Sequence, residues 1–202
     1  MFYESAKGHG LPHDPFKALV VPRPIGWVTT MNARGDINLS PYSFFNAVSD
    51  RPYMVAFSSD GRKDAVTYVE ETGEFVCNVA TFDLKEAMNA TSAPLPRGRS
   101  EMEHAGLAAA PSIMVKPPRV AAAPAALECK WLQTVPLTPL EGDDARYFLV
   151  VGQVVGVYID DRFISDGLVD TAAMRPIARA GYRDYFVATP ETKFSLTRPA
   201  GG

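Results

Sequence analysis

Residues 23–67 read RPIGWVTTMNARGDINLSPYSFFNAVSDRPYMVAFSSDGRKDAVT, and this stretch decides the fold. Its first part, Ile25–Met31, is rich in residues that favour β-strands and ends at the turn signal Asn32–Gly35. A polar and aromatic segment, Asn38–Ser49, comes next, and we expect it to form a loop. Its amides and aromatic rings would lie side by side.

A second β-rich run, Tyr53–Phe57, leads through the polar turn Ser58–Lys63 to a helix start at Asp64. Free N–H groups and the positive end of the helix dipole would meet the serines and the two basic side chains of that turn. These are the components of a small phosphate site. Taken alone, the turn has a plainer alternative, a solvated connection between a strand and a helix.

The rings of Tyr42, Phe44 and Phe45 offer apolar surface beside the loop amides, an arrangement that can hold a flat heteroaromatic ring. Core residues under a loop are the alternative. The strand Tyr53–Phe57 separates the loop from the basic turn by roughly 17 Å. That spacing suits a flat ring at one end and its phosphate tail at the other.

The composition bounds the class of protein. The chain has 202 residues, is 47% hydrophobic and 21% charged, and carries a net charge of −3. It therefore has enough apolar residues for a core, and it lacks the block of Lys and Arg expected of a protein that binds nucleic acid or an anionic membrane. Cys77 and Cys129 lie in strand-like runs, and we expect both to be reduced thiols.

The remaining chain reads mostly as strand. The runs Glu74–Ala80 and Leu127–Trp131 are short, whereas Arg146–Asp160 is long and apolar, which predicts a strand buried on both faces. Two glycines within it, Gly152 and Gly156, predict a bulge or a close approach of another backbone.

Helices are expected to be few. We predict a first helix over residues 64–72, which Asp64 caps at its start and Gly73 ends. Asp83 and Glu86 match a capping box, which predicts a second helix through Met88. A short helical turn is expected at residues 101–105. We therefore predict a mainly β fold, a small antiparallel barrel with a few helices. One domain would span residues 1–202, with an extended segment at 1–21 and a frayed tail at 199–202.

No constellation predicts a metal or a catalytic side chain. The three histidines, His9, His13 and His104, lack metal-ligand spacing, and adjacent carboxylates such as Glu70–Glu71 are typical of solvated turns and helix ends. The first ten residues lack the apolar core of a signal peptide, and the longest apolar run is too short to cross a membrane. We expect a cytoplasmic protein.

The stretch 23–67 resembles the flavin reductase-like family, whose domain is an FMN-binding split β-barrel. The similarity continues at Thr72–Val76, Met88–Ser92, Arg179–Tyr185 and 194–199, so it covers about Pro22 to Pro199. Many relatives carry Arg-Leu-Gly-Gly at the C-terminal turn, where this chain has Arg179-Ala180-Gly181-Tyr182.

The resemblance implies which residues hold the cofactor. One strand and the loop would line the flavin ring, the basic turn and the following helix would hold the ribityl phosphate, and the segment near residue 90 would lie beside the flavin. The implied residues are Trp27, Val28, Thr29, Thr30, Ser43, Phe44, Phe45, Asn46, Ser58, Ser59, Arg62, Lys63, Asp64, Thr67, Asn89, Thr91 and Ser92.

The same resemblance implies an NAD(P)H:flavin oxidoreductase. NADH or NADPH would pass hydride to FMN, and the reduced flavin would serve a separate acceptor, such as a partner monooxygenase, a metal centre or oxygen. Because hydride transfer depends on stacking of the two rings, no side chain needs to move a proton in that step. Family members with small barrels pair, so a homodimer with FMN near its interface is expected.

Two alternatives stay open. The altered turn Arg179–Tyr182 borders the nicotinamide side that the resemblance implies. The first alternative is therefore a flavoredoxin-like electron carrier, or a flavin-binding protein without efficient oxidation of NAD(P)H. A split-barrel oxidase that acts on a phosphorylated pyridine would need a patch rich in Arg and His, and the C-terminal half has only scattered arginines.

Overall fold

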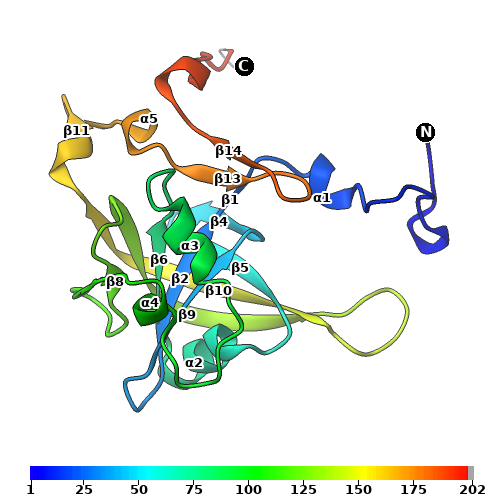
Figure 1. Cartoon of the computed structure of the whole chain (residues 1–202), viewed down its shortest axis with the longest axis horizontal. Coiled ribbons are helices and arrows are strands. Elements are labelled where there is room, and N and C mark those ends of the chain that lie inside the picture. Colours follow the sequence, from blue (N-terminus) through cyan, green and yellow to red (C-terminus); the bar gives the residue numbers. More distant parts are fainter. Residues whose placement is uncertain (200–202) are drawn as a thin grey trace.

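The computed structural model describes residues 1–199 and is built around one antiparallel sheet of seven strands. In spatial order the sheet runs β3-β2-β6-β9-β10-β5-β4 (Figure 1). Its strands are β2 (Gly26–Met31), β3 (Ile37–Tyr42), β4 (Phe45–Asp50), β5 (Tyr53–Asp60), β6 (Glu74–Val79), β9 (Ala125–Leu137) and β10 (Tyr147–Ile159).

The sheet curls until its two edges meet. The edge strands β3 and β4 are consecutive in the chain, and only Ser43 and Phe44 lie between them. The curl also brings β4 against β2, because a Cβ added at Gly26 would lie 2.5 Å from Cδ2 of Phe45. The fold is therefore a split β-barrel, as the sequence predicted.

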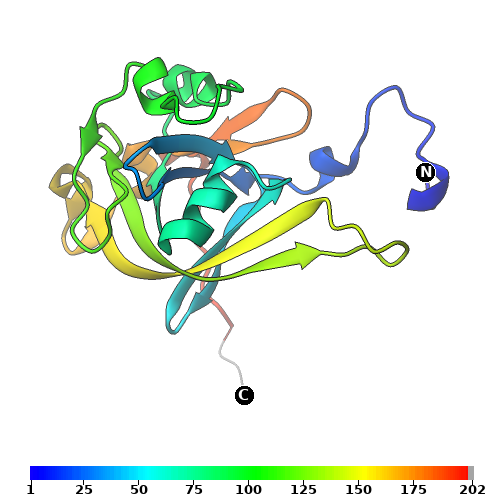
Figure 2. The ribbon, with the colours of Figure 1, turned by 90° about the horizontal axis from the view of Figure 1, so that it is seen from below.

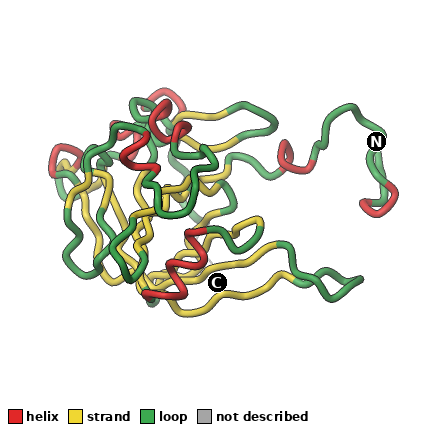
Figure 3. Tube along the Cα trace, turned by 60° about the horizontal axis from the view of Figure 1, so that its bottom comes forward, coloured by secondary structure: helices red, strands yellow, loops and turns green. Residues whose placement is uncertain are grey.

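Short elements surround this barrel. A small sheet joins β1 (Arg23–Pro24), β13 (Ile177–Arg179) and β14 (Tyr185–Val187), while β7 (Ala109–Ala110) pairs with β8 (Arg119–Val120) and β11 (Ile164–Ser165) pairs with β12 (Leu168–Val169). Figure 3 shows how little of the trace is helical. The α-helices are α1 (Phe16–Leu19), α2 (Asp64–Thr72), α3 (Lys85–Ala90), α4 (Glu101–His104) and α5 (Thr171–Met174), with 3-10 turns η1 (Ser5–Lys7), η2 (Asp161–Phe163) and η3 (Pro190–Thr192).

Helix α2 packs inside the curl of the sheet (Figure 2). Its buried Val66 and Val69 join a core that includes Phe57 of β5, Phe75 of β6 and Val150 of β10. The helix ends as predicted, with Gly73 in the left-handed conformation at φ 73°. Its first helical residue is Asp64, and Lys63 is the N-cap, so the predicted start is confirmed although Asp64 does not cap it.

The segment Asn38–Ser49 is not a loop. Nearly all of it lies in β3 and β4, which pair with β2 and β5. Polar side chains hid this, because the buried Asn38 is a polar residue whose partner, Glu101, lies 63 residues away in the chain. The second β run is likewise longer than expected, since β5 continues through Ser58 and Ser59 to Asp60.

Two further predictions were wrong. Helix α3 begins at Lys85 with Leu84 as its N-cap, so there is no capping box; the Asp83 carboxylate instead accepts a hydrogen bond from Arg175 at 3.1 Å. Strand β10 is only half buried rather than buried on both faces, because the sheet has one face toward the core. Its glycines do coincide with irregular pairing, since the register with β9 shifts at Val151/Gly152 and Val154/Gly156.

Two arms leave the barrel on the same side (Figures 1 and 2). One is the N-terminal segment, which includes α1, and the other is the tip of the β9–β10 hairpin. The frayed tail predicted at residues 199–202 falls almost entirely outside the described residues. Within the described part, no helix is both long and apolar enough to span a membrane. The assignment of residues 1–202 to a single domain stays a prediction.

Candidate functional site

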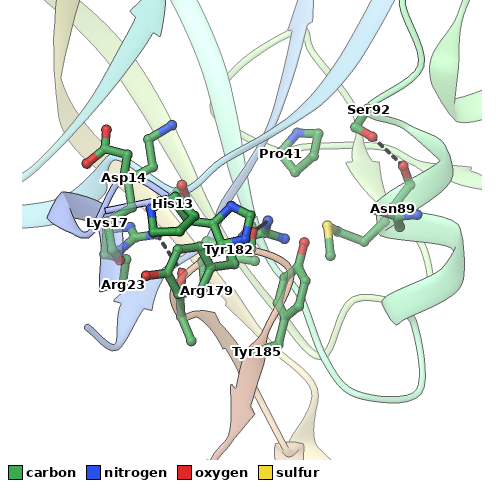
Figure 4. A pocket seen from close by; sticks show the side chains of 15 residues that line it. His13, Asp14, Lys17, Arg23, Pro41, Asn89, Ser92, Arg179, Tyr182 and Tyr185 are labelled. Atoms are coloured by element: carbon green, nitrogen blue, oxygen red, sulfur yellow. Dashed lines mark hydrogen bonds between the residues drawn. The ribbon is translucent and has the colours of Figure 1, made fainter. Parts of the chain in front are cut away.

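Two adjoining cavities form one groove across the end of β3. The larger has a volume of about 720 Å³ and the smaller about 560 Å³, and both are lined by Pro41 and Ser92. The smaller one, here called the helix-start cavity, lies at the first residues of α2. The larger one, here called the arm–turn cavity, lies between the N-terminal arm and the turn that joins β13 to β14 (Figure 4).

The helix-start cavity offers an anion site. Lys63 and Asp64 line it, and no side chain of residues 1–199 caps the first N–H groups of α2. The Asp64 carboxylate is paired with Nε of Arg97 at 2.7 Å, whereas Lys63 has no ion-pair partner among residues 1–199. An uncapped helix start beside an unpaired ammonium group is suited to bind a phosphate.

The other acidic residue of this cavity already accepts hydrogen bonds from the protein. Glu101 is 6% exposed and accepts hydrogen bonds from Nδ2 of Asn38 at 2.9 Å and from the Leu39 N–H at 3.1 Å. Burial raises the pKa of its carboxyl group. Burial also raises the pKa of Tyr42 to about 12, so this phenol stays neutral.

Helix α3 carries the side chains that line the middle of the groove. The indole N–H of the fully buried Trp27 donates to Oγ1 of Thr91 at 2.9 Å, and the Thr91 hydroxyl donates to the Met88 carbonyl at 2.7 Å. The Ser92 hydroxyl donates to the Asn89 carbonyl at 2.7 Å (Figure 4). These bonds fasten the end of α3 to β2 and hold Asn89 and Ser92 at the groove.

The structure gathers part of the predicted cofactor set along this groove. The lining residues are Ser43, Lys63, Asp64, Asn89, Thr91 and Ser92. Their binding of a flavin stays a prediction.

The other predicted residues do not line the two cavities. Four of them form the buried strand β2, where Thr29 accepts a hydrogen bond from Asn78: Trp27, Val28, Thr29 and Thr30. Phe45 packs against the core, Asn46 is exposed on β4, Ser59 is buried and donates to the Gly61 carbonyl, and Thr67 is half-buried in the second turn of α2.

Three more predicted residues face elsewhere. Phe44 and Ser58 line a separate, mostly apolar cavity next to α1. Arg62 turns away from the groove, pairs with Glu70 and lies 4.6 Å from the ring centroid of Phe148.

Sequence reasoning missed one wall of the groove. His13 and Lys17 come from the N-terminal arm and Arg23 from β1, and no role was assigned to any of them. Tyr182 and Tyr185 come from the opposite end of the chain. The family resemblance did place the turn at residues 179–185 near the site. For the arm, the only local signal is an arginine between two prolines directly before β2, and nothing in its pattern predicts contact with residues 180–185.

Comparison with known proteins identifies the family. The model of the flavin reductase like domain matches residues 18–175. The chain belongs to this family. The family resemblance read from the sequence is thereby confirmed, and the curled sheet is the split barrel of such proteins.

Relatives from three bacteria support the assignment. An uncharacterized protein of Halalkalibacterium halodurans is 38% identical over 185 residues, covering 89% of this chain and 87% of the relative. Nitrilotriacetate monooxygenase component B from Bacillus cereus has a TM-score of 0.84 and 28% identity, covering 97% of this chain and 98% of that one. The 2-nitrobenzoate 2-nitroreductase of Pseudomonas fluorescens has a TM-score of 0.80 and 28% identity, covering 91% and 88%.

Proposed function

We propose that this chain is an FMN-binding flavin reductase, which takes hydride from NADH or NADPH and supplies reduced flavin or electrons to a separate acceptor. The observation that carries the proposal is the pair of adjoining cavities. One has an uncapped helix start beside Lys63, which forms no ion pair within residues 1–199, and the larger one shares Pro41 and Ser92 with it. Bound FMN would supply the redox chemistry.

The residues present fit such a cofactor. At the phosphate end, Lys63 and the first N–H groups of α2 would meet the charge, while Arg97 keeps the Asp64 carboxylate paired. In the middle, Ser43, Asn89 and Ser92 offer polar groups for the edge of a planar ring, with the Met88 side chain as apolar surface. None of these side chains needs to transfer a proton, because the protein's part is to bind and orient.

The proposal extends to partners and location. Bacillus cereus component B is named as part of a monooxygenase, which supports a separate acceptor protein for this chain. We also propose a homodimer, because two arms with exposed apolar side chains leave the barrel on one side. An enzyme that draws on NADH or NADPH would work in the cytoplasm.

The phosphate end is tested by two neighbouring basic residues. Lys63→Gln is expected to weaken FMN binding about tenfold, because it removes the unpaired charge at the anion site. Riboflavin, which lacks the phosphate, should bind both proteins alike. Arg62→Gln is the matched control, since Arg62 is paired with Glu70 and faces away. Fluorescence titration of FMN and riboflavin measures each affinity.

The hydride donor is tested on the FMN-loaded protein under anaerobic conditions. Prompt bleaching of the flavin spectrum by NADH or NADPH would establish the reductase and its donor. A flavin that bleaches only with dithionite would favour the carrier instead. Absence of any FMN uptake, or equal loss with Arg62→Gln and Lys63→Gln, would overturn the assignment of the groove.

A further inference from the structure

Positive charge gathers at the arm–turn cavity, where Asp14 is the one acidic residue among the lining side chains and forms no ion pair within residues 1–199. Lys17, Arg23 and Arg179 all line this cavity, and none of them forms an ion pair with an acidic side chain of residues 1–199. His13 lies beside them (Figure 4). The acidic residue of the same wall, Asp14, uses Oδ1 to accept the Phe16 N–H at 2.9 Å.

Arg23 is the most unusual of these cations because it is only 5% exposed. Its guanidinium donates to the carbonyls of Lys17 and Val20 in the arm and to that of Ala180 in the turn, while its Nε–H has no acceptor in the described chain. Neutral carbonyls orient the group but leave its charge unbalanced. Burial and the nearby charge of Arg179 both lower the pKa of Arg23, so an anion placed between the two would relieve a real cost.

Arg23 also fastens the arm to the turn. A second contact does the same, because a Cβ added at Gly181 would lie 2.9 Å from Cα of Ala18. The backbone of the turn therefore lies directly on α1. Arg23 is thus a fixed part of the fold, whereas Lys17 and His13 are exposed side chains at the rim of the cavity.

Tyr182 adds an aromatic side to this wall at a conformational cost. Its φ is 53°, in the left-handed region that residues other than glycine seldom adopt. Its ring meets His13 edge-on with centroids 5.8 Å apart, and the nearby Arg179 guanidinium lies 4.5 Å from the ring centroid of Tyr185. A bulky side chain in the left-handed conformation, at the rim of a cavity, indicates that this side chain helps to determine which ligand the cavity binds.

We propose that the end of the groove formed by His13, Lys17, Arg23, Arg179, Tyr182 and Tyr185 binds the oxyanion group of a planar second substrate, and that Tyr182 selects that substrate by packing on its ring. The proposal deepens the proposed function, on which it rests, because the second substrate must share the groove with flavin. The oxyanion is a carboxylate on an aromatic acceptor or a phosphate of the pyridine nucleotide.

Calorimetric titration of the FMN-loaded protein with benzoate and with its neutral analogue benzamide tests the carboxylate source. Benzoate is expected to bind at least tenfold more tightly than benzamide. Lys17→Gln should remove that preference, whereas Lys193→Gln, a charge removal outside the cavities described, should leave it intact. A parallel titration with NADH tests the nucleotide source, with the same two variants.

Tyr182 is tested by variants that separate the ring from the backbone. Tyr182→Asn keeps a residue that tolerates the left-handed conformation, so its melting temperature should stay close to that of the parent, while the affinity for the preferred anion falls about tenfold. Tyr182→Phe keeps the ring and should restore binding.

The outcomes are distinct. Benzoate binding that depends on Lys17 identifies an aromatic carboxylate, and NADH binding that depends on Lys17 without benzoate binding identifies the nucleotide phosphate. If the binding of neither anion depends on Lys17 and Tyr182 while FMN binds normally, the proposed subsite is refuted and the proposed function stands. Failure of FMN binding would show up in the flavin titration, and benzoate can then be titrated into the flavin-free protein.

Discussion

At the scale of single residues, Gly152 shows how one missing side chain lets the barrel close. It lies on β10 opposite Trp131 of β9, at a shift in register. A Cβ at this position would lie 2.3 Å from Cζ of Phe75 and 3.1 Å from the Lys130 carbonyl oxygen. Phe75 is fully buried in the barrel core, so its ring has no space to retreat.

Gly152→Ala is therefore expected to destabilise the protein by about 1–3 kcal/mol, through overpacking against Phe75. The free energy of unfolding, measured by urea titration, checks this. Gly156→Ala on the same strand is the control, because its nearest contact is the flexible Met114 side chain at 3.1 Å, which is 53% exposed and can move. Equal losses in the two variants would contradict the role given to Phe75.

At the scale of elements, α3 depends on one threonine for its position over the groove. Thr91 is 1% exposed, accepts from the Trp27 indole and donates to the Met88 carbonyl. Sequence reasoning assigned Thr91 to the flavin by resemblance. The structure shows its hydroxyl occupied within the protein, so any effect on a cofactor would pass through the placement of Asn89 and Ser92.

Thr91→Val should leave the Trp27 N–H buried without an acceptor and cost about 1–3 kcal/mol of stability. It should also weaken FMN binding, because α3 loses its attachment to β2. Thr91→Ser keeps the hydroxyl and serves as control. Thermal unfolding and flavin titration are the measurements. If the Val variant is as stable as the Ser variant, the hydrogen bond from the Trp27 indole does not hold α3 in place.

At the scale of the whole molecule, the two arms leave apolar side chains unprotected. In the hairpin tip Leu140 is fully exposed, and in α1 Phe16 is 56% and Leu19 74% exposed. Figure 1 shows both arms extending beyond the barrel on one side. Isolated apolar arms of this kind are costly in water, and a second copy of the chain would cover them.

Light scattering after size exclusion should therefore give about twice the chain mass. Leu140→Asp is expected to shift the protein toward the monomer, since a charge would be buried in the contact. Leu168→Asp, at an exposed leucine of β12 away from the arms, should leave the dimer intact. A monomeric parent protein would refute the homodimer.

Local pattern explains most of what could be predicted. The β-rich runs around Trp27, Tyr53 and Cys77, and the helix from Asp64 to the glycine at residue 73, were all found, because each is specified by neighbours in the chain. The strands β3 and β4 were missed since their pairing partners, not their own residues, determine their conformation. The capping box at Asp83 failed because that carboxylate accepts a hydrogen bond from Arg175, 92 residues away.

The family, the mainly β class and the basic turn before α2 could be read from the chain alone, since they depend on short-range pattern and on resemblance. The set of side chains that meet at the groove follows instead from long-range contacts. Arg62 pairs with Glu70 away from the groove, Lys63 lines the cavity, and Arg23 of β1 donates to the Ala180 carbonyl, 157 positions away. Those contacts arise from chain closure and burial, which bring distant residues together with no local signal in the chain.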